Sequence, residues 1–339
     1  MGKYNLGVDL GGTDIKVGVV KENGEEYTII ARGEAKTQVS KGSGAGIPAN
    51  KDADIIVSNI VKACNEAIES AGITWDEIET VGVGSPGAIN RADGIVVFAG
   101  NLNLNNFPLA NEIEKKIGKK VFLCNDADAA VVGEFVAGEA KGKTNAVCVT
   151  LGTGVGGGII IGGKLYSGSN LIGGEVGHMV IQYNGIKCNC GRKGCFERYA
   201  SASAIIEKTK EAMKKNRDSL MWEIAGTIGK VDGKTAFKAM KQGDEVAKEV
   251  VDEYIKYVAC GLMNIIAIFQ PEVLCIGGGM SNEDEKYLLE PINEIINNEQ
   301  FAHKALKDEN VKIIPCKVVI AKHKNDAGRI GASCLHKYV

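Results

Sequence analysis

The chain has 339 residues, which is too long for one core of ordinary size and suits two domains that share a cleft. Its 40 lysine and arginine residues nearly balance 42 aspartate and glutamate residues, so charge alone would attract neither nucleic acid nor an anionic membrane. We therefore expect small-molecule ligands, and no nucleic acid or membrane partner.

The N-terminal residues "MGKYNLGVDL" contain no basic stretch that leads into a long apolar run. No later segment reaches the roughly 18 apolar residues that a membrane span needs. Seven of the ten cysteines are scattered singly through apolar surroundings, which is typical of reduced thiols. These features predict a cytoplasmic protein.

The N-terminal residues 4–35 predict three strands. Glycines bend the chain after the first strand, and Asn23-Gly24 favours a tight hairpin between the second and the third. Residues 37–50 form a Gly/Ser-rich loop, which could be a lid or a solvated insertion. Residues 52–72 then place apolar side chains at helical spacing before a glycine stop, and residues 79–89 predict a further strand.

The opening pattern returns in the middle of the chain. "LGVDLGGTDIKVGVV" (6–20) and "VCVTLGTGVGGGIII" (147–161) each consist of an apolar strand, a glycine-rich bend and a second apolar strand. A duplicated chain would carry one phosphate-sized turn in each half, and the two turns could face one polyphosphate across a cleft. Ordinary hairpins without a ligand are the alternative. A third glycine run, 277–279, follows another apolar strand and favours ligand binding.

Two other nucleotide motifs fit the second glycine bend poorly. Gly152, Gly154 and Gly157 match the dinucleotide fingerprint, but that motif needs a helix directly after the glycines, and "GIIIGGKLYSG" favours a strand and a turn. No G-K-[ST] follows the glycines, which excludes a Walker A loop. Farther along, residues 244–269 predict a long helix that ends before Pro271, and residues 325–339 predict a final helix.

One histidine and three cysteines cluster within eighteen positions: His178, Cys188, Cys190 and Cys195. One imidazole and three thiolates make a four-ligand structural zinc set. Glycines at 185, 191 and 194 would let so short a loop turn back on its ligands. A disulfide would leave one cysteine over, and unligated core thiols suit so polar a stretch poorly. The zinc ion would pin a loop that has Glu175 before it and Glu197 after it.

Carboxylates stand at two predicted strand ends. Asp9 ends the first strand beside a glycine turn, where it could order Mg²⁺ through water or simply cap the turn. Asp126 follows an apolar strand and begins a predicted helix, so it could be an N-cap. Strand ends that face a cleft are also where ligands bind in open α/β sheets. A hydroxyl that attacks a phosphoryl group needs a base to accept its proton, and a carboxylate can do so.

These motifs together resemble the actin-like ATPase superfamily. The segments "LCNDADAAVVGE" (123–134), "GGEVGH" (173–178) and "CNCGRKGCFERYAS" (188–201) resemble the ROK family more narrowly, and within it the bacterial ATP-dependent glucokinases. The resemblance implies an α/β fold of two ribonuclease H-like domains flanking a cleft that holds ATP. We expect a small discontinuous domain over 1–118 plus 326–339, and a large domain over 119–325 with the zinc loop at 178–195.

The resemblance also implies a function and a set of site residues. The expected reaction is ATP-dependent phosphorylation of the 6-hydroxyl of a hexose, with Asp126 as the general base. Glucose is favoured, and mannose, fructose, allose or an N-acetylhexosamine are the alternatives. The expected hexose contacts are Asn101, Asn125, Asp126, Glu175, His178 and Glu197. The expected contacts to ATP and Mg²⁺ are Asp9, Gly11, Gly12, Thr13, Lys16, Thr153, Gly154, Gly278 and Gly279.

Two functions of other classes are weighed against a kinase. Some ROK members are transcriptional repressors with a DNA-binding segment ahead of the first hairpin, but that hairpin begins here at Leu6. An Hsp70-like ATPase would share the nucleotide turns and has no need of a zinc set or an Asn-Asp base. Members of the resembled family are commonly dimers or tetramers, so a homo-oligomer is expected.

Overall fold

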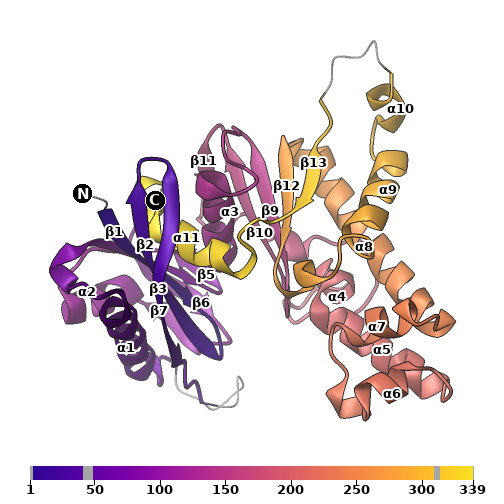
Figure 1. The fold of residues 1–339 in the computed structure, drawn as a ribbon, viewed down its shortest axis with the longest axis horizontal. Helices are drawn as coiled ribbons and strands as arrows, with labels where there is room; N and C mark the ends of the chain where they lie inside the picture. The colour runs from indigo at the N-terminus through magenta and orange to yellow at the C-terminus, as the bar shows by residue number, and fades with distance from the viewer. Residues whose placement is uncertain (1–2, 41–48, 309–313, 339) are drawn as a thin grey trace. The chain divides into compact units, whose positions relative to one another are not determined.

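The computed structural model describes residues 3–40, 49–308 and 314–338, so most of the loop expected over 37–50 lies outside the described residues. The chain divides into two compact units (Figure 1). The first comprises Met1–Cys148, Gly158–Gly174 and Ala321–Val339, and the second comprises Val149–Gly157 and Glu175–Ile320. The C-terminal segment therefore belongs to the same unit as the N-terminus. The domain bounds expected from the sequence stay a prediction.

The first unit contains a five-stranded mixed sheet in the order β3-β2-β1-β4-β8. Its strands are β1 (Lys3–Leu10), β2 (Asp14–Asn23), β3 (Glu26–Lys36), β4 (Ile78–Ser85) and β8 (Val121–Asn125). The first three strands are antiparallel, whereas β1, β4 and β8 run parallel. The three N-terminal strands and the Asn23-Gly24 hairpin are thereby confirmed. Gly24 has a φ of 64°, which glycine adopts without strain.

Helices cover both faces of this sheet. Helices α1 (Ala53–Ala71) and α2 (Leu109–Ile117) lie on one face (Figure 1). The structure thus confirms the helix that apolar spacing predicted over 52–72. A Cβ on Gly33 would lie 2.1 Å from the carbonyl oxygen of Ala63 in α1. On the opposite face, α11 (Ala327–Ser333) packs on β1 and β4, and α3 (Asp126–Ala137) packs on α11.

Glycines allow α11 its close packing. A Cβ on Gly7 or on its register partner Gly82 would lie 1.8 Å from a carbonyl oxygen of α11. The final helix is shorter than the sequence suggested, because single 3-10 turns at Lys324–Asp326 and Leu335–Lys337 flank α11. The segment packed between the sheet and α3 is therefore the only part of 325–338 that forms an α-helix.

A second sheet has the order β11-β10-β9-β12-β13. Its strands are β9 (Ala146–Leu151), β10 (Val155–Ile161), β11 (Lys164–Tyr166), β12 (Val273–Gly277) and β13 (Lys317–Ile320). The second glycine hairpin is confirmed, because residues 152–154 connect β9 directly to β10 and no helix follows. A small antiparallel sheet consists of β5 (Ala88–Asn90), β6 (Ile95–Ala99) and β7 (Leu104–Phe107).

Helices make up much of the second unit. Its α-helices are α4 (Glu197–Ala200), α5 (Ala202–Lys215), α6 (Met221–Ala225), α7 (Thr235–Lys241), α8 (Glu245–Phe269), α9 (Leu289–Glu299) and α10 (His303–Leu306). The long helix predicted over 244–269 is confirmed as α8. Asp244 caps it by accepting a hydrogen bond from the amide of Ala247 at 2.8 Å, and Gln270 ends it with a φ of 40° before Pro271.

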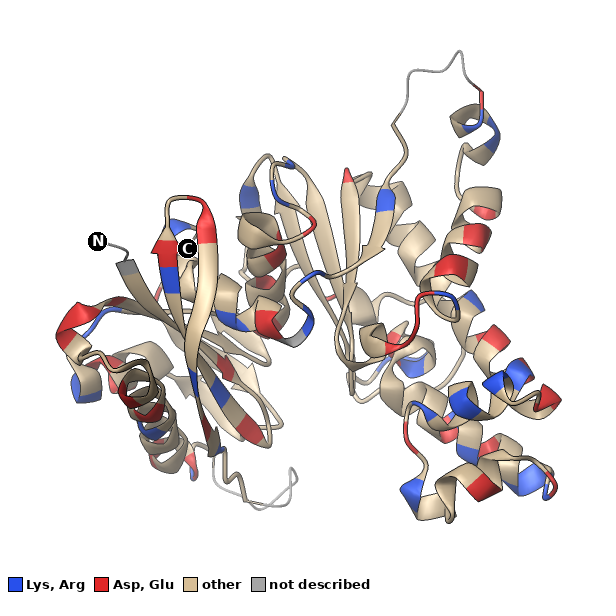
Figure 2. Ribbon diagram, in the orientation of Figure 1, with Lys and Arg blue, Asp and Glu red and all other residues tan. Residues whose placement is uncertain are grey.

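The described helices do not combine the length and apolar character that crossing a membrane requires. Basic and acidic residues are interspersed along the helices and strands of each unit (Figure 2). Several of these residues form ion pairs, for example Arg198 with Glu207 and Lys208 with Glu253. This distribution agrees with the balanced composition.

Candidate functional site

The carboxyl ends of three parallel strands carry the expected acidic residues of the first unit. Strands β1, β4 and β8 end at Leu10, Ser85 and Asn125, at one edge of the sheet. Asp9 pairs in register with Gly84, and a Cβ on Gly84 would lie 3.5 Å from the Cα of Asp126. The fold therefore brings Asp9 and Asp126 to the same sheet edge, where ligands bind in open α/β sheets.

Asp9 lies in an environment that opposes its ionisation. Burial raises the pKa of its carboxyl above the ordinary value, and the positive charges of Lys16 and Arg329 oppose this rise. Lys16 is the register partner of Asp9 on β2. A carboxylate oxygen at the base of a glycine turn is a hard ligand, which suits Mg²⁺ or its water shell.

The first glycine turn is fixed by backbone hydrogen bonds. The amide of Gly11 donates to the carbonyl of Asp14 at 2.9 Å. Thr37 supports the turn from outside, because its hydroxyl donates to the carbonyl of Gly11 at 2.7 Å and its amide donates to the carbonyl of Thr13 at 2.9 Å. The sequence analysis did not identify Thr37 as a site residue. The one feature that could have pointed to it is its position directly after the third strand. Gly12 and Thr13 are exposed.

Asn101 lies beside this turn. A Cβ on Gly12 would lie 3.5 Å from the Nδ2 atom of Asn101. The turn expected to contact nucleotide and an amide expected to contact hexose are therefore neighbours within one unit.

Asp126 is the first residue of α3, and Asn125 caps that helix. The Oδ1 atom of Asn125 accepts a hydrogen bond from the amide of Ala127 at 2.8 Å, and its Nδ2 atom donates to the carbonyl of Gly87 at 3.0 Å. The Asn125 side chain thus fixes the start of the helix that carries Asp126. Asp128 is buried in the first turn of α3.

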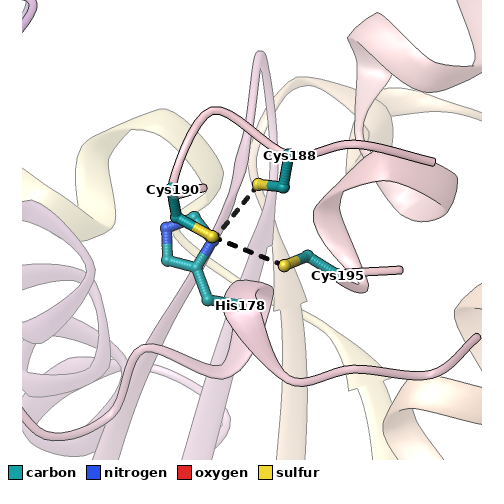
Figure 3. A group of neighbouring side chains, drawn as sticks. All are labelled: His178, Cys188, Cys190 and Cys195. Carbon is teal, nitrogen blue, oxygen red and sulfur yellow. Dashed lines mark hydrogen bonds between the residues drawn. The ribbon is translucent and has the colours of Figure 1, made fainter. Parts of the chain in front are cut away.

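In the second unit, the four expected metal ligands come together (Figure 3). Their potential ligand atoms all lie within 4.8 Å of one another. The Sγ atom of Cys188 lies 3.7 Å from Nδ1 of His178, and the Sγ atoms of Cys190 and Cys195 lie 3.6 Å apart. A tetrahedral zinc ion with bonds of about 2.0–2.3 Å holds its ligands roughly 3.5–3.8 Å apart.

The chemistry of the cluster also fits a cation. Burial raises the pKa of Cys195 to about 12, and the neighbouring thiols contribute to the rise. Burial likewise opposes the ionisation of Cys190, but hydrogen bonds from the Arg192 amide and the other two thiols outweigh it and lower the pKa. A divalent cation would offset the repulsion among the three thiolates. The His/Cys₃ cluster is therefore consistent with a zinc site.

The metal loop is closed by glycines and backbone pairing. Gly191 and Gly194 have φ values of 91° and 81°, which favour glycine. A Cβ on Gly194 would lie 1.7 Å from the carbonyl of Gln182, so the loop could not close with a larger residue there. Isolated bridges pair Val180 with Cys195 and Lys187 with Lys193.

Glu175 and Glu197 flank the cluster. Burial raises the pKa of Glu175, the electrostatic effect of His178 lowers it, and that of Glu197 raises it further. The two carboxylates are thus close enough to repel one another. Glu197 begins α4, and its Oε2 atom accepts a hydrogen bond from the amide of Val155 at 3.0 Å.

The other two glycine turns meet within the second unit. Gly278 has a φ of 81°, and a Cβ on it would lie 2.6–2.7 Å from backbone atoms of Leu151. Leu151 directly precedes the turn 152–154, in which the amide of Gly152 donates to the carbonyl of Gly154 at 3.0 Å. Thr153 and Gly279 are exposed. The expected nucleotide contacts of this unit therefore form one group.

Known proteins with sequences and structures similar to this chain include both kinases and regulators. A glucokinase of Thermotoga maritima is 40% identical over 290 residues, which are 85% of this chain and 86% of the relative. A xylose repressor of Caldicellulosiruptor bescii is 30% identical over 259 residues, which are 76% of this chain and 64% of the repressor.

The fold also matches a solved structure over nearly its whole length. A ROK family glucokinase from Streptomyces griseus, solved in complex with glucose and AMPPNP, is 31% identical, covers 98% of both chains and has a TM-score of 0.79. The expected α/β fold of two ribonuclease H-like domains is confirmed. The sequence pattern of the ROK family matches residues 5–339, and this chain therefore belongs to the ROK family.

Proposed function

We propose that this protein transfers the γ-phosphoryl group of ATP to the 6-hydroxyl of a hexose, with glucose as the preferred acceptor. The observation that carries the proposal is the position of Asp9 and Asp126 at one sheet edge, beside a glycine turn. Two relatives add support. The relative at 40% identity is a glucokinase, and the structural match at 31% identity holds glucose and an ATP analogue.

Asp126 acts as the general base in this proposal. The hexose hydroxyl oxygen attacks the γ-phosphorus, the bond from that phosphorus to the bridging oxygen of ADP breaks, and the hydroxyl proton passes to the Asp126 carboxylate. The hydrogen bonds of Asn125 to Ala127 and Gly87 fix the helix start and limit the motion of the base. Asn101, Asn125, Glu175, His178 and Glu197 are the proposed hexose contacts beside Asp126.

The nucleotide is held by backbone turns and a few side chains. The proposed contacts are Asp9, Gly11, Gly12, Thr13, Lys16, Thr153, Gly154, Gly278 and Gly279. Glycine turns present backbone N–H groups to phosphate oxygens without interference from side chains. Mg²⁺, when bound, would offset the charge that develops on the transferred phosphoryl group. Asp9 would order its water shell.

Zinc is the proposed ion of the His/Cys₃ cluster. With four protein ligands, the set leaves no open position for substrate, so the role is structural. The cluster fixes the segment between Glu175 and Glu197, and we therefore assign it the shaping of the hexose pocket.

A coupled assay of ADP release across a panel of hexoses tests the proposed function. Glucose should give the highest kcat/KM, and mannose, fructose, allose and N-acetylglucosamine should give lower values. Preference for one of these sugars would change the substrate and keep the reaction class. Lack of hexose-dependent ADP release by zinc-loaded protein with Mg²⁺ would refute the proposal.

A regulatory function is the second candidate, because a xylose repressor is 30% identical over 76% of this chain. A regulator without kinase activity would bind sugar and leave ATP unchanged. Sugar titration by calorimetry together with the ADP assay separates the two, since only a kinase responds in both. An ATPase stimulated by peptide, and unaffected by hexose, would indicate a chaperone-like module instead.

We further propose a homo-oligomer, a dimer or a tetramer, by analogy with the family. Multi-angle light scattering during size-exclusion chromatography measures this directly. A single monomeric peak at micromolar concentration would refute it.

A further inference from the structure

The segment that directly follows the last metal ligand holds the second glycine turn. Two consecutive carbonyl groups of this turn accept hydrogen bonds from it. The amide of Ala202 donates to the carbonyl of Gly152 at 2.7 Å. The hydroxyl of Ser203 donates to the carbonyl of Thr153 at 2.8 Å.

Glu197 engages the end of the same turn. Its Oε2 atom accepts a hydrogen bond from the amide of Val155 at 3.0 Å. A Cβ on Gly154 would lie 2.3 Å from the same oxygen, so the carboxylate lies directly against the turn. The turn is therefore bound by residues 197–203 along its whole length.

The segment before the metal loop contacts Val155, the residue that directly follows the turn. Gly177 directly precedes the ligand His178, and a Cβ on Gly177 would lie 2.0 Å from the carbonyl oxygen of Val155. Both ends of the metal loop thus meet the first residue of β10. A change in the path of the loop would displace these contacts.

The holding segment is itself rigid. Phe196 is fully buried, and its amide donates to the carbonyl of Met179 at 2.8 Å. The Phe196 ring packs directly against α8, because a Cβ on Gly261 of that helix would lie 2.2 Å from a ring carbon. Ser201 caps α5 by accepting from the amide of Ala204 at 3.1 Å, and the hydroxyl of Tyr254 donates to the carbonyl of Ala200 at 3.0 Å. The segment is therefore anchored to the long helix of the unit.

From these contacts we infer that residues 197–203 form a clamp that positions the turn 152–154 for the nucleotide, and that the metal loop controls nucleotide binding as well as the hexose pocket. The inference rests on the proposed function in one respect, because it takes the turn as a nucleotide contact. Ser203 and Glu197 are positioning residues in this role. A turn already held in place loses less conformational entropy when a ligand binds, which favours affinity.

Ser203→Ala tests the clamp with the least disturbance, because Ser203 lies outside both the metal cluster and the expected hexose contacts. Calorimetric titration with AMPPNP and Mg²⁺, without sugar, should show a Kd about threefold to tenfold higher than for the parent protein. The hexose Kd and the zinc content should not change. Ser203→Thr keeps the hydroxyl and should restore the parent affinity. Ser58→Ala is the matched control, because Ser58 also donates to a backbone carbonyl, that of Asp54 at 2.7 Å.

Two substitutions at Glu197 separate its roles. Glu197→Gln keeps an acceptor oxygen for the Val155 amide and should retain nucleotide affinity while hexose affinity falls. Glu197→Ala removes the acceptor and should lower both. Equal nucleotide affinity of the Glu197→Gln and Glu197→Ala variants would overturn the clamp.

Hydrogen exchange measured without any ligand keeps the inference separable from the proposed function. Ser203→Ala and, to a greater extent, removal of zinc by a chelator should accelerate amide exchange at 152–155, while α8 stays protected. Unchanged exchange at 152–155 after either change would refute the clamp, whether or not the parent protein binds nucleotide. Failure of the parent protein to bind AMPPNP, with the exchange effect present, would refute the proposed function and leave the clamp standing.

Discussion

The Oε1 atom of Glu134 accepts a hydrogen bond from the backbone amide of His323 at 2.8 Å, across 189 positions of the chain. Glu134 is fully buried near the end of α3. Its Oε2 atom accepts from the amides of Glu139 and Lys322, both at 3.0 Å. One carboxylate therefore ties the segment that leads into α11 to the helix that begins with Asp126.

Glu134→Ala should lower the free energy of unfolding by about 2–4 kcal/mol, because three amides lose a charged acceptor and a cavity remains. Urea unfolding followed by circular dichroism measures the loss. Glu134→Gln keeps one acceptor oxygen and should cost less. Glu26→Ala is the matched control, because the Glu26 side chain is exposed. Equal stability of Glu134→Ala and the control would contradict the assigned role of this contact.

Asp126→Asn should reduce kcat by about 10²- to 10⁴-fold, because the amide cannot accept the hydroxyl proton. The hexose Kd, measured by calorimetry, should change much less. Asp54→Asn is a suitable control, because Asp54 is an exposed acid in the first turn of α1. Turnover of Asp126→Asn near the parent rate, in protein that still binds hexose, would remove Asp126 from the mechanism.

Purified protein should contain about one zinc ion per chain, measured by mass spectrometry of the metal. Removal of zinc should lower kcat/KM for the hexose by up to about a hundredfold through misplacement of Glu175 and Glu197, before either unit unfolds. Cys188→Ser should reproduce this effect, because Cys188 is a buried member of the cluster.

Cys260→Ser serves as the control for that experiment, because Cys260 lies on α8 outside the cluster. It should keep both the zinc and the activity. Parent activity in a protein shown to contain no zinc would refute the structural role of the metal.

Asp244 gives the fold a specific dependence on pH. Burial raises the pKa of its carboxyl, but hydrogen bonds from the Ser219 hydroxyl and from the amides of Ala247 and Leu220 outweigh burial and lower it. A native-state pKa below the unfolded-state value of about 3.9 means that ionised Asp244 stabilises the fold above that pH. This contribution is lost as the pH falls through the native pKa.

The free energy of unfolding should therefore fall on acidification from about pH 5, and it should fall less steeply for Asp244→Asn. Asp244→Ala should also cost about 1–3 kcal/mol at pH 7, because α8 loses its cap. Denaturant unfolding at several pH values measures both effects. Asp76→Asn, at an exposed carboxyl, should follow the parent curve. Parallel curves for the parent and Asp244→Asn would contradict the prediction.

Local sequence was sufficient for much of the fold. Asn23-Gly24 and the cap Asp244 act on the backbone within a few residues, and a glycine-rich bend between two apolar strands marks the second hairpin, so the two hairpins and α8 could be predicted. The His178 to Cys195 spacing could be predicted to form a cluster for the same reason, because its ligands lie within one short loop.

The length of the final helix and the support of the glycine turns depend on contacts between distant segments. Thr37 supports Gly11 across 26 positions, and Ser203 supports Thr153 across 50. A hydroxyl that donates to a distant carbonyl has no local pattern, because any serine or threonine can do so once the fold brings it near.

The sequence by itself determined which side chains could perform the chemistry: the Asn-Asp pair at 125–126, the four metal ligands and the three glycine turns. The metal ligands cluster within one short loop, but only the tertiary structure decided which residues from distant segments lie at the same edge of a sheet. Asp9 reaches the same edge as Asp126 because β1, β4 and β8 are parallel neighbours, in a sheet that α1 and α11 cover on its two faces. Packing of this kind is a property of the whole chain, and no short segment encodes it.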